Sequence, residues 1–245
     1  MSEDGGPGPL PREQFVAWLR REGECRYHDR HRYHALMHQG RLDRAQLQQW
    51  VRNRYYYQTR IPVKDAIILS KSDDPTFRRA WCRRLSDHDG EAPGEGGLAL
   101  WLHLAEAAGL DREEVASCRG VLPGVRFACD AYVELVRERS LVEAVASSLT
   151  ECFAPDLMSR RIAAWERHYP WVDPAALGYF RARVPRARRD AEEGLDFVVR
   201  HATTFDLQER CVAALVRKTE ILWHLLDCLY VAYVEPGWGP AGAVA

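Results

Sequence analysis

The chain has 245 residues, 47% of them hydrophobic, which is near the upper end of the usual size of one domain. Its 34 basic and 35 acidic residues leave a formal net charge of -1, which excludes the strong positive field of a nucleic-acid or anionic-membrane binder. No stretch approaches the roughly 20 apolar residues that span a bilayer, and residues 1–11 lack the apolar part of a secretory signal, so we expect a cytoplasmic protein with a small-molecule ligand.

A helical spacing of apolar side chains recurs along the chain. These side chains repeat at i, i+3, i+4 and i+7, and alternating runs joined by hairpin turns are missing. We therefore predict an all-α fold in a single catalytic domain over 1–245, with flexible ends at 1–11 and 235–245. The predicted helices are 11–22, 28–38, 43–60, 62–72, 75–89, 96–109, 111–118, 124–139, 141–158, 159–167, 174–184, 186–202 and 204–233.

The predicted helix over 43–60 carries polar side chains on a face that should be apolar. The residues of that face are Trp50, Arg54, Tyr57, Gln58 and Ile61. Arginine donates in a planar fork that suits carboxylates, and tyrosine and glutamine donate single hydrogen bonds. Pro62 is predicted to bend the chain so that Lys64 points inward. An amphipathic interface is the alternative interpretation of this pattern.

The predicted helix over 75–89 shows the same feature. Phe77, Trp81, Arg84 and His88 share one face, and the helix ends in Asp87-His88-Asp89-Gly90. The pKa of histidine is near neutrality, so an imidazole beside a cavity can move protons. A capping role for His88 is the alternative.

Two later segments offer weaker candidates. Thr150 and Glu151 precede Arg161, and Tyr179 lies one helical turn before Arg183. Both groupings place a basic side chain near hydrogen-bonding partners. Each is also compatible with a surface pair or an interhelix pair.

The predicted helix over 204–233 has a charged residue within an apolar stripe. The stripe consists of Cys211, Leu215, Lys218, Leu222, Leu225 and Leu229. Lys218 is one of only three lysines among the 34 basic residues, and its ammonium either faces a ligand, reaches the surface or pairs with a carboxylate. At least five predicted helices offer Arg, Lys, Tyr or His toward one side, which favours a shared pocket for a small anion.

Long motifs occur in order over residues 12–233. They are Tyr27-His28, Tyr33-His34, Met37-His38, WVRNRYYYQTRIPVKD at 50–65, DHDG at 87–90, VLPGVRFA at 121–128, SSLTECFAP at 147–155 and HYPW at 168–171. Through these motifs the chain resembles the pyrroloquinoline-quinone synthase family. The resemblance implies a compact seven-helix bundle like haem oxygenase and TenA, which forms a homodimer and holds no haem, metal or organic cofactor.

The resemblance also implies a reaction. The family closes a ring on a bicyclic amino-dioxo tetracarboxylate precursor and oxidises it with dioxygen, which yields the tricyclic quinone and hydrogen peroxide. Such a substrate would explain an arginine-rich pocket, because bidentate arginines hold carboxylates and aromatic rings cover planar faces. The expected partners are therefore this small polycarboxylate and dioxygen, without nucleic acid or membrane.

At matching positions the resemblance implies roles for individual residues. The expected catalytic residues are His88, His28, Tyr57, Tyr179, Arg183 and Lys218. The expected substrate-binding residues are Tyr27, Arg54, Gln58, Lys64, Arg84, Tyr132, Thr150, Glu151, Arg161 and Leu222. His88 is expected to move protons at the reacting ring, with His28 and Tyr57 nearby.

One residue departs from the family pattern, and two alternatives stay open. Met158 stands where the family has an active-site histidine, and a thioether cannot donate a proton. A divergent quinone-binding protein without turnover is therefore one alternative. The other is a metal-dependent oxygenase, for which the pairs Glu220/His224 and His103/Glu106 have ligand spacing; the seven scattered cysteines form no metal knuckle.

Overall fold

The computed structural model describes residues 7–235, and every regular element among them is helical. In chain order, with η for a 3-10 helix, the elements are α1 (Arg12–Arg26), η1 (His28–Arg30), α2 (Arg32–His38), α3 (Arg44–Ser70), α4 (Pro75–Asp89), α5 (Gly96–Ala107), α6 (Arg112–Ala116), α7 (Pro123–Glu138), α8 (Leu141–Ser147), η2 (Ser148–Phe153), α9 (Ala154–His168), η3 (Pro174–Leu177), α10 (Gly178–His201) and α11 (Phe205–Tyr233). The predicted all-α class is confirmed, although these residues form more helical segments than seven. The ends expected to be flexible lie largely outside the described residues.

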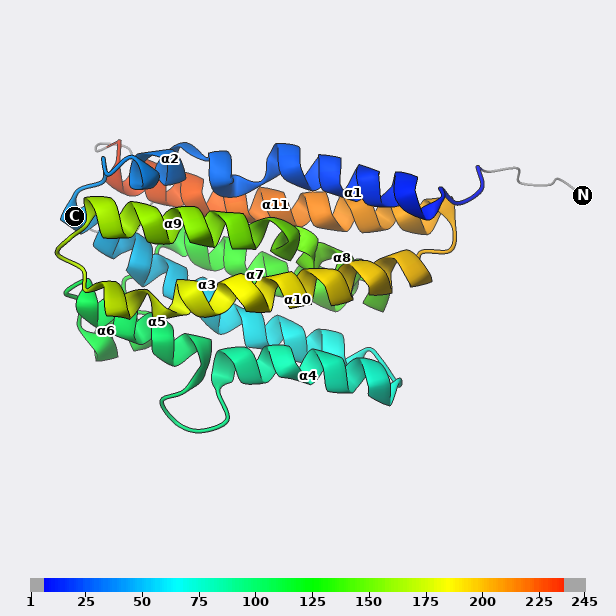
Figure 1. The fold of residues 1–245 in the computed structure, drawn as a ribbon, viewed down its shortest axis with the longest axis horizontal. Coiled ribbons are helices and arrows are strands. Elements are labelled where there is room, and N and C mark those ends of the chain that lie inside the picture. The colour runs from blue at the N-terminus through cyan, green and yellow to red at the C-terminus, as the bar shows by residue number, and fades with distance from the viewer. Residues whose placement is uncertain (1–6, 236–245) are drawn as a thin grey trace, which may run out of the picture.

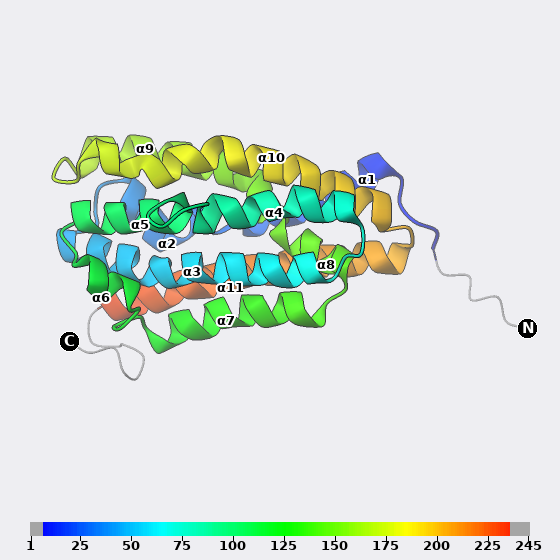
Figure 2. The ribbon, with the colours of Figure 1, turned by 90° about the horizontal axis from the view of Figure 1, so that it is seen from below.

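Two long helices, α3 and α11, run along the middle of the molecule (Figures 1 and 2). Helix α3 packs against α4, α5 and α7, whereas α11 packs against α1, α7 and α8. Helices α9 and α10 pack alongside each other on one side of the molecule, and α7 lies on the opposite side (Figures 1 and 2). Segments that are far apart in the sequence therefore face a common interior.

Helix α3 is longer than predicted. Its first turn is fixed by a capping box in which the Asp43 side chain accepts from the Gln46 backbone and the Gln46 side chain accepts from the Asp43 backbone. The helix then continues through Pro62 to Ser70, so the predicted break between 60 and 62 was wrong. A proline removes only the one hydrogen bond to the carbonyl of residue i-4, here Gln58, and burial on both sides of it keeps the remaining turns helical.

Other predicted boundaries also need correction. Helix α10 likewise continues through Pro185, so the predicted break at that proline was wrong. The single helix predicted over 141–158 is instead α8, η2 and the start of α9, and Pro155 lies in the first turn of α9, where a proline loses no helical hydrogen bond. The predicted helix 11–22 extends to Arg26, and the predicted helix 28–38 is divided into η1 and α2.

Aromatic side chains in tilted and edge-to-face contact form the core at one end of the bundle. The ring centroid of Trp50 lies 5.5 Å from that of Trp101, 5.9 Å from that of Trp165 and 6.4 Å from that of Phe180. The Trp101 indole N–H donates to the backbone carbonyl of Val51 at 3.0 Å, so this buried polar group is satisfied. No helix within residues 7–235 has the length and apolar composition needed to cross a membrane.

Candidate functional site

An enclosed cavity lies where α3, α4, η2, α9, α10 and α11 meet, and we call it the inner cavity. It is lined by Tyr27, His28, Arg54, Tyr57, Gln58, Ile61, His88, Thr150, Glu151, Ala154, Met158, Tyr179, Arg183 and Leu222. All predicted site residues line it except Lys64, Arg84, Tyr132, Arg161 and Lys218. Those five are buried.

The helical faces predicted from the sequence do point inward. In α4 the buried residues are Phe77, Trp81, Arg84 and His88, which is the predicted face. In α11 the whole stripe around Lys218 is buried, and Lys218 itself is 0% exposed, so it does not reach the surface. The structure thus brings the predicted residues together, and their individual roles stay predictions.

Three of the basic side chains at the site are paired with carboxylates. Lys64 Nζ lies 2.6 Å from Asp65 Oδ1 and 3.1 Å from Ser148 Oγ. Arg183 lies 2.5 Å from a Glu151 oxygen and 3.4 Å from an Asp190 oxygen. Arg84 also pairs with Asp190. These buried charges are therefore compensated within the protein.

The other three, Arg54, Arg161 and Lys218, have no carboxylate partner in the part of the chain that the structure describes. The Arg54 guanidinium lies 3.9 Å from the centroid of the Tyr57 ring. Arg161 Nη2 donates to His34 Nε2 at 3.2 Å, and Lys218 Nζ lies 3.2 Å from the centroid of the Tyr132 ring.

Besides burial, the charge of Arg54 helps to lower the pKa of each of the other two unpaired basic groups. Burial, and secondly Arg54, lower the pKa of Arg161 to about 9. The same two causes hold the pKa of Lys218 well below its usual range. Because an unpaired buried charge costs several kcal/mol, this set of residues favours an anionic guest.

His88 is held in a defined protonation state. Its Nδ1 lies 3.1 Å from the carbonyl oxygen of Arg84, which can only accept, so Nδ1 carries the proton and Nε2 is left as an acceptor. Burial, followed by the charge of Arg183, lowers the pKa of His88 to about 4. At neutral pH the imidazole is therefore an uncharged base at the cavity wall.

His28 and His34 are neutral for the same reason. Burial, followed by Arg54, holds the pKa of His28 well below its usual range, and burial followed by Arg161 does so for His34. The two ring centroids lie 5.0 Å apart, and His34 Nδ1 donates to the His28 carbonyl at 3.0 Å. His34 thus orients Arg161 through its other nitrogen.

A tyrosine orients the glutamine in the wall of the inner cavity. The Tyr179 hydroxyl donates to Gln58 Oε1 at 2.7 Å, which fixes the side-chain amide of Gln58. The pKa of Tyr179 is raised by burial, so its hydroxyl keeps its proton at neutral pH. The amide nitrogen of Gln58 is left to donate to a guest.

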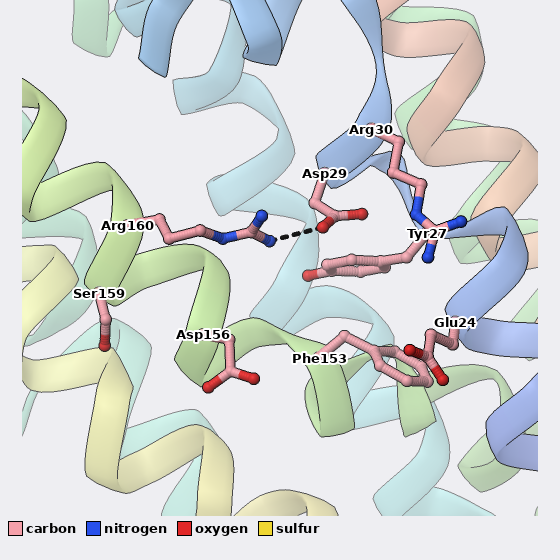
Figure 3. Close-up of a pocket in the computed structure, with 8 residues that line it drawn as sticks. All are labelled: Glu24, Tyr27, Asp29, Arg30, Phe153, Asp156, Ser159 and Arg160. Carbon is pink, nitrogen blue, oxygen red and sulfur yellow. Dashed lines mark hydrogen bonds and ion pairs between the residues drawn. The ribbon is translucent and has the colours of Figure 1, made fainter. Parts of the chain in front are cut away.

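A second, outer cavity adjoins the first. It is lined by Glu24, Tyr27, Asp29, Arg30, Phe153, Asp156, Ser159 and Arg160, so Tyr27 borders both cavities (Figure 3). The Tyr27 ring lies 5.3 Å from the Phe153 ring, and above it Asp29 pairs with Arg160 at 2.5 Å (Figure 3). The outer cavity has about 520 Å³ of free volume and the inner cavity about 50 Å³.

The pairs with metal-ligand spacing lie elsewhere. Glu220, His224, His103 and Glu106 are exposed or border other surfaces, and none lines the inner cavity. Among the described residues no group of three or more His, Cys, Asp or Glu side chains is placed to hold a metal ion. These pairs therefore do not favour the metal-dependent alternative.

Asp65 and Asp190 were not predicted as site residues. Asp65 pairs with Lys64, and Asp190 pairs with Arg84 and Arg183. A signal for Asp190 was present, because it follows Arg183 by seven positions, which is two helical turns on the same face. The many arginines between 181 and 189 obscure this spacing, because such a charged segment is typical of an exposed helix.

Comparisons with known proteins agree with this geometry. The TENA/THI-4/PQQC family model matches residues 16–228. A pyrroloquinoline-quinone synthase from Rhizobium meliloti is 54% identical over 232 residues, which cover 95% of this chain and 91% of that protein. One from Acidiphilium cryptum is 51% identical over 231 residues, with 94% of each chain covered.

Solved structures are similar in fold. A domain of unknown function with a haem-oxygenase-like fold from Shewanella denitrificans gives a TM-score of 0.76 at 14% identity and covers 96% of this chain and 98% of its own. A TenA homologue from P. horikoshii gives 0.69 at 12% identity, covering 88% and 98%. These similarities confirm the predicted haem-oxygenase/TenA-like fold.

Proposed function

The chain belongs to the TENA/THI-4/PQQC family and, within it, to the pyrroloquinoline-quinone synthases, and on this premise we propose that it makes pyrroloquinoline quinone. In the proposed reaction it closes a ring on a bicyclic amino-dioxo tetracarboxylate precursor and oxidises the product with dioxygen, releasing hydrogen peroxide. It works as a cytoplasmic homodimer without a metal or organic cofactor.

The unpaired basic residues are the observation that carries this proposal. Arg54 lines the inner cavity, and Arg161 and Lys218 contact residues of its wall, Met158 and Tyr57. None of the three has an acidic partner among the described residues, and Tyr27, Tyr57 and Tyr179 offer aromatic faces in the same lining. A planar polycarboxylate supplies both the missing anions and a flat surface for the rings. A neutral or cationic guest would leave the basic groups uncompensated.

The residues at the cavity also suit proton transfer. Neutral His88 accepts a proton through Nε2, and its Arg84 hydrogen bond keeps the imidazole oriented as it does so. Arg183 lies beside it and stabilises negative charge that develops on the substrate or on reduced oxygen. The electrons come from the substrate, because a reduced quinol-like ring can itself reduce dioxygen.

Binding requires side chains to move. The inner cavity, at about 50 Å³, holds only a few waters and not a tricyclic molecule. Tyr27 lines both cavities, so a displaced Tyr27 ring would join the two spaces. Figure 3 shows this ring in the wall of the outer cavity. We take this junction as the route to the basic groups.

The deciding experiment incubates the purified protein with the bicyclic precursor in air. We expect the absorption spectrum of the quinone to appear together with hydrogen peroxide, at an unchanged rate after dialysis against a metal chelator. Loss of activity on chelation would favour the metal-dependent oxygenase and contradict the cofactorless reaction.

A second candidate function is a quinone carrier, which one observation favours. Met158 lies in the wall of the inner cavity, 3.9 Å from Arg161 Nη1, and offers a thioether where an imidazole would carry a proton. A carrier would bind the precursor in air and leave it unoxidised in a single-turnover measurement. Any stoichiometric oxidation of bound precursor would exclude a carrier.

A further inference from the structure

A buried carboxylate outside the inner cavity holds several arginines at once. Asp190 of α10 is 3% exposed and does not line the cavity. Its oxygens lie 2.8 Å from Arg189 Nη2, 3.4 Å from Arg183 Nη1 and 3.8 Å from Arg84 Nε. Its backbone carbonyl accepts from Arg84 Nη2 at 2.5 Å. Asp190 is thus the shared anion of three guanidinium groups.

Arg183 is held from two sides by carboxylates of different kinds. Glu151 contacts it at 2.5 Å from within the cavity wall, with a side chain that is 25% exposed. A polyanionic guest in the inner cavity would compete with Glu151 for Arg183 and repel it. Asp190 does not line the cavity, so a guest there would not compete with it for Arg183 in the same way.

Asp190 also holds the Arg84 side chain. Its backbone carbonyl accepts from Arg84 Nη2, and its carboxylate lies 3.8 Å from Arg84 Nε. The network continues outward, because Arg189 pairs with Asp87, the residue before His88, at 2.5 Å. The His88 hydrogen bond to the Arg84 backbone carbonyl lies within α4 itself, so Arg183 is the residue of the cavity wall that Asp190 contacts directly.

We propose that Asp190 is a positioning residue for the oxidation, which sets the Arg183 guanidinium at the cavity wall. This inference rests on the proposed function, because it assigns Asp190 to the same site. Its charge, more than its volume, is what matters, since two of its contacts are ion pairs with guanidinium groups that face or adjoin the cavity.

The test compares Asp190→Asn, which keeps the shape and removes the charge, with Asp190→Glu, which keeps the charge and adds a methylene. The concentration of folded active sites is measured by stoichiometric binding of pyrroloquinoline quinone. Turnover is then divided by this concentration, so that misfolded protein does not lower the apparent kcat. We expect kcat per binding site to fall roughly tenfold to a hundredfold in Asp190→Asn, with a smaller fall in Asp190→Glu. KM should change little, since the cavity has lost no cation.

The matched control is Asp196→Asn, a change of the same kind at an exposed position of α10 where the carboxylate pairs with Arg12 and Arg200. It should keep the wild-type kcat. A purely structural role for Asp190 predicts the opposite ranking, with the isosteric asparagine more active than the larger glutamate. That ranking, or a wild-type kcat in Asp190→Asn, would overturn the inference.

A crystal structure of Asp190→Asn gives a readout that does not depend on turnover. We expect the Arg183 guanidinium to move by about 1 Å or more, or to split between positions. An unmoved Arg183 contradicts the inference even if the wild type makes the quinone, whereas an inactive wild type with a displaced Arg183 contradicts only the proposed function. If Asp190→Asn does not fold, Arg189→Gln replaces it; a lower kcat supports the inference and an unchanged kcat overturns it.

Discussion

Basic residues at this site either have a carboxylate partner or lack one, and this difference determines how each affects stability and anion binding. Lys64 and Arg183 have carboxylate partners inside the protein, so removing either leaves a buried anion behind. Arg54, Arg161 and Lys218 have none among the described residues, so each makes the ligand-free protein less stable and the complex with an anion more stable. Stability and binding should therefore respond in opposite directions to their removal.

Lys218→Met tests this opposition. Methionine fills much of the same volume and removes a fully buried amine that has no hydrogen-bond partner among the described residues. We expect the free energy of unfolding of the ligand-free protein to rise by about 1 kcal/mol or more. Affinity for pyrroloquinoline quinone should fall at least about tenfold, or ~1.4 kcal/mol. Urea unfolding and equilibrium titration measure the two effects.

The control for Lys218→Met is Arg217→Met, one position earlier in α11, where the side chain is 60% exposed and pairs with Glu220. It should leave affinity unchanged, because an exposed ion pair contributes little. Lower stability together with wild-type affinity in Lys218→Met would show that Lys218 is an ordinary core residue.

His88→Ala separates binding from chemistry. The change removes the neutral base at the cavity wall and leaves the unpaired basic groups in place. Turnover should fall roughly 10²- to 10⁴-fold, while the Kd for pyrroloquinoline quinone stays close to that of the wild type. His201→Ala, at an exposed histidine, is the control. Wild-type turnover in His88→Ala would remove His88 from the mechanism.

For single residues, the sequence predicts which charged side chains are buried better than it predicts which residues they pair with. Helical periodicity alone puts Arg84, His88 and Lys218 on the same helix faces as apolar residues, and those faces are buried in the structure. It does not show that Asp190 meets Arg84, since that contact joins α10 to α4 across 106 positions of sequence. Pairing depends on how helices pack, which local spacing does not encode.

At the scale of helices, the effect of each proline on the helix boundaries is the hardest feature to predict from the sequence. Pro62 and Pro185, predicted to break helices, lie inside continuous ones, whereas Pro155 does mark a helix start. The difference is burial: α3 and α10 are held on several sides by neighbouring helices, which outweighs one lost hydrogen bond. Residues 148–153, predicted as α-helix, form η2, because apolar spacing does not distinguish a 3-10 turn from an α-helical one.

Pro62→Ala measures what the α3 proline costs. The substitution restores a backbone N–H for the carbonyl of Gln58, so we expect the free energy of unfolding to rise by up to about 3 kcal/mol. Turnover should fall only if the proline sets the direction of Lys64, which is buried against Asp65 and Ser148. A loss of stability in Pro62→Ala would mean that α3 is packed around a proline-shaped backbone.

For the whole molecule, the helical class is predictable and the arrangement is not. Periodicity predicts that 43–60 and 204–233 are helices, but not that α3 and α11 lie together in the middle with α7 beside both. The resemblance supplies that arrangement, and the similar solved structures confirm it. The arrangement buries many ionisable groups in one interior, and their burial makes the stability of the molecule depend on pH.

Buried histidines set the direction of that dependence. Burial lowers the pKa of His88 from 6.5 to about 4 and holds those of His28 and His34 well below 6.5. Below pH 6.5 the unfolded chain binds protons at these positions while the folded protein does not, so stability falls as pH falls. Lys218, whose pKa is also lowered, acts in the same direction, but its effect begins at higher pH, as the pH falls below the usual 10.5. His88 alone should account for a loss on the order of 3 kcal/mol between pH 6.5 and 4.

Urea unfolding of the ligand-free protein at a series of pH values from about 7 to about 4 measures this loss. His88→Asn, which removes the titrating group, should flatten the decline, whereas His103→Asn, at a histidine whose side chain is 59% exposed, should leave it unchanged. The carboxylate of Asp190 does not interfere in this window, because against the effect of burial the charges of Arg84 and Arg183 lower its pKa below 3.8. A flat stability profile down to about pH 4 would mean that these imidazoles are solvated, and the enclosed basic cavity would then not exist in solution.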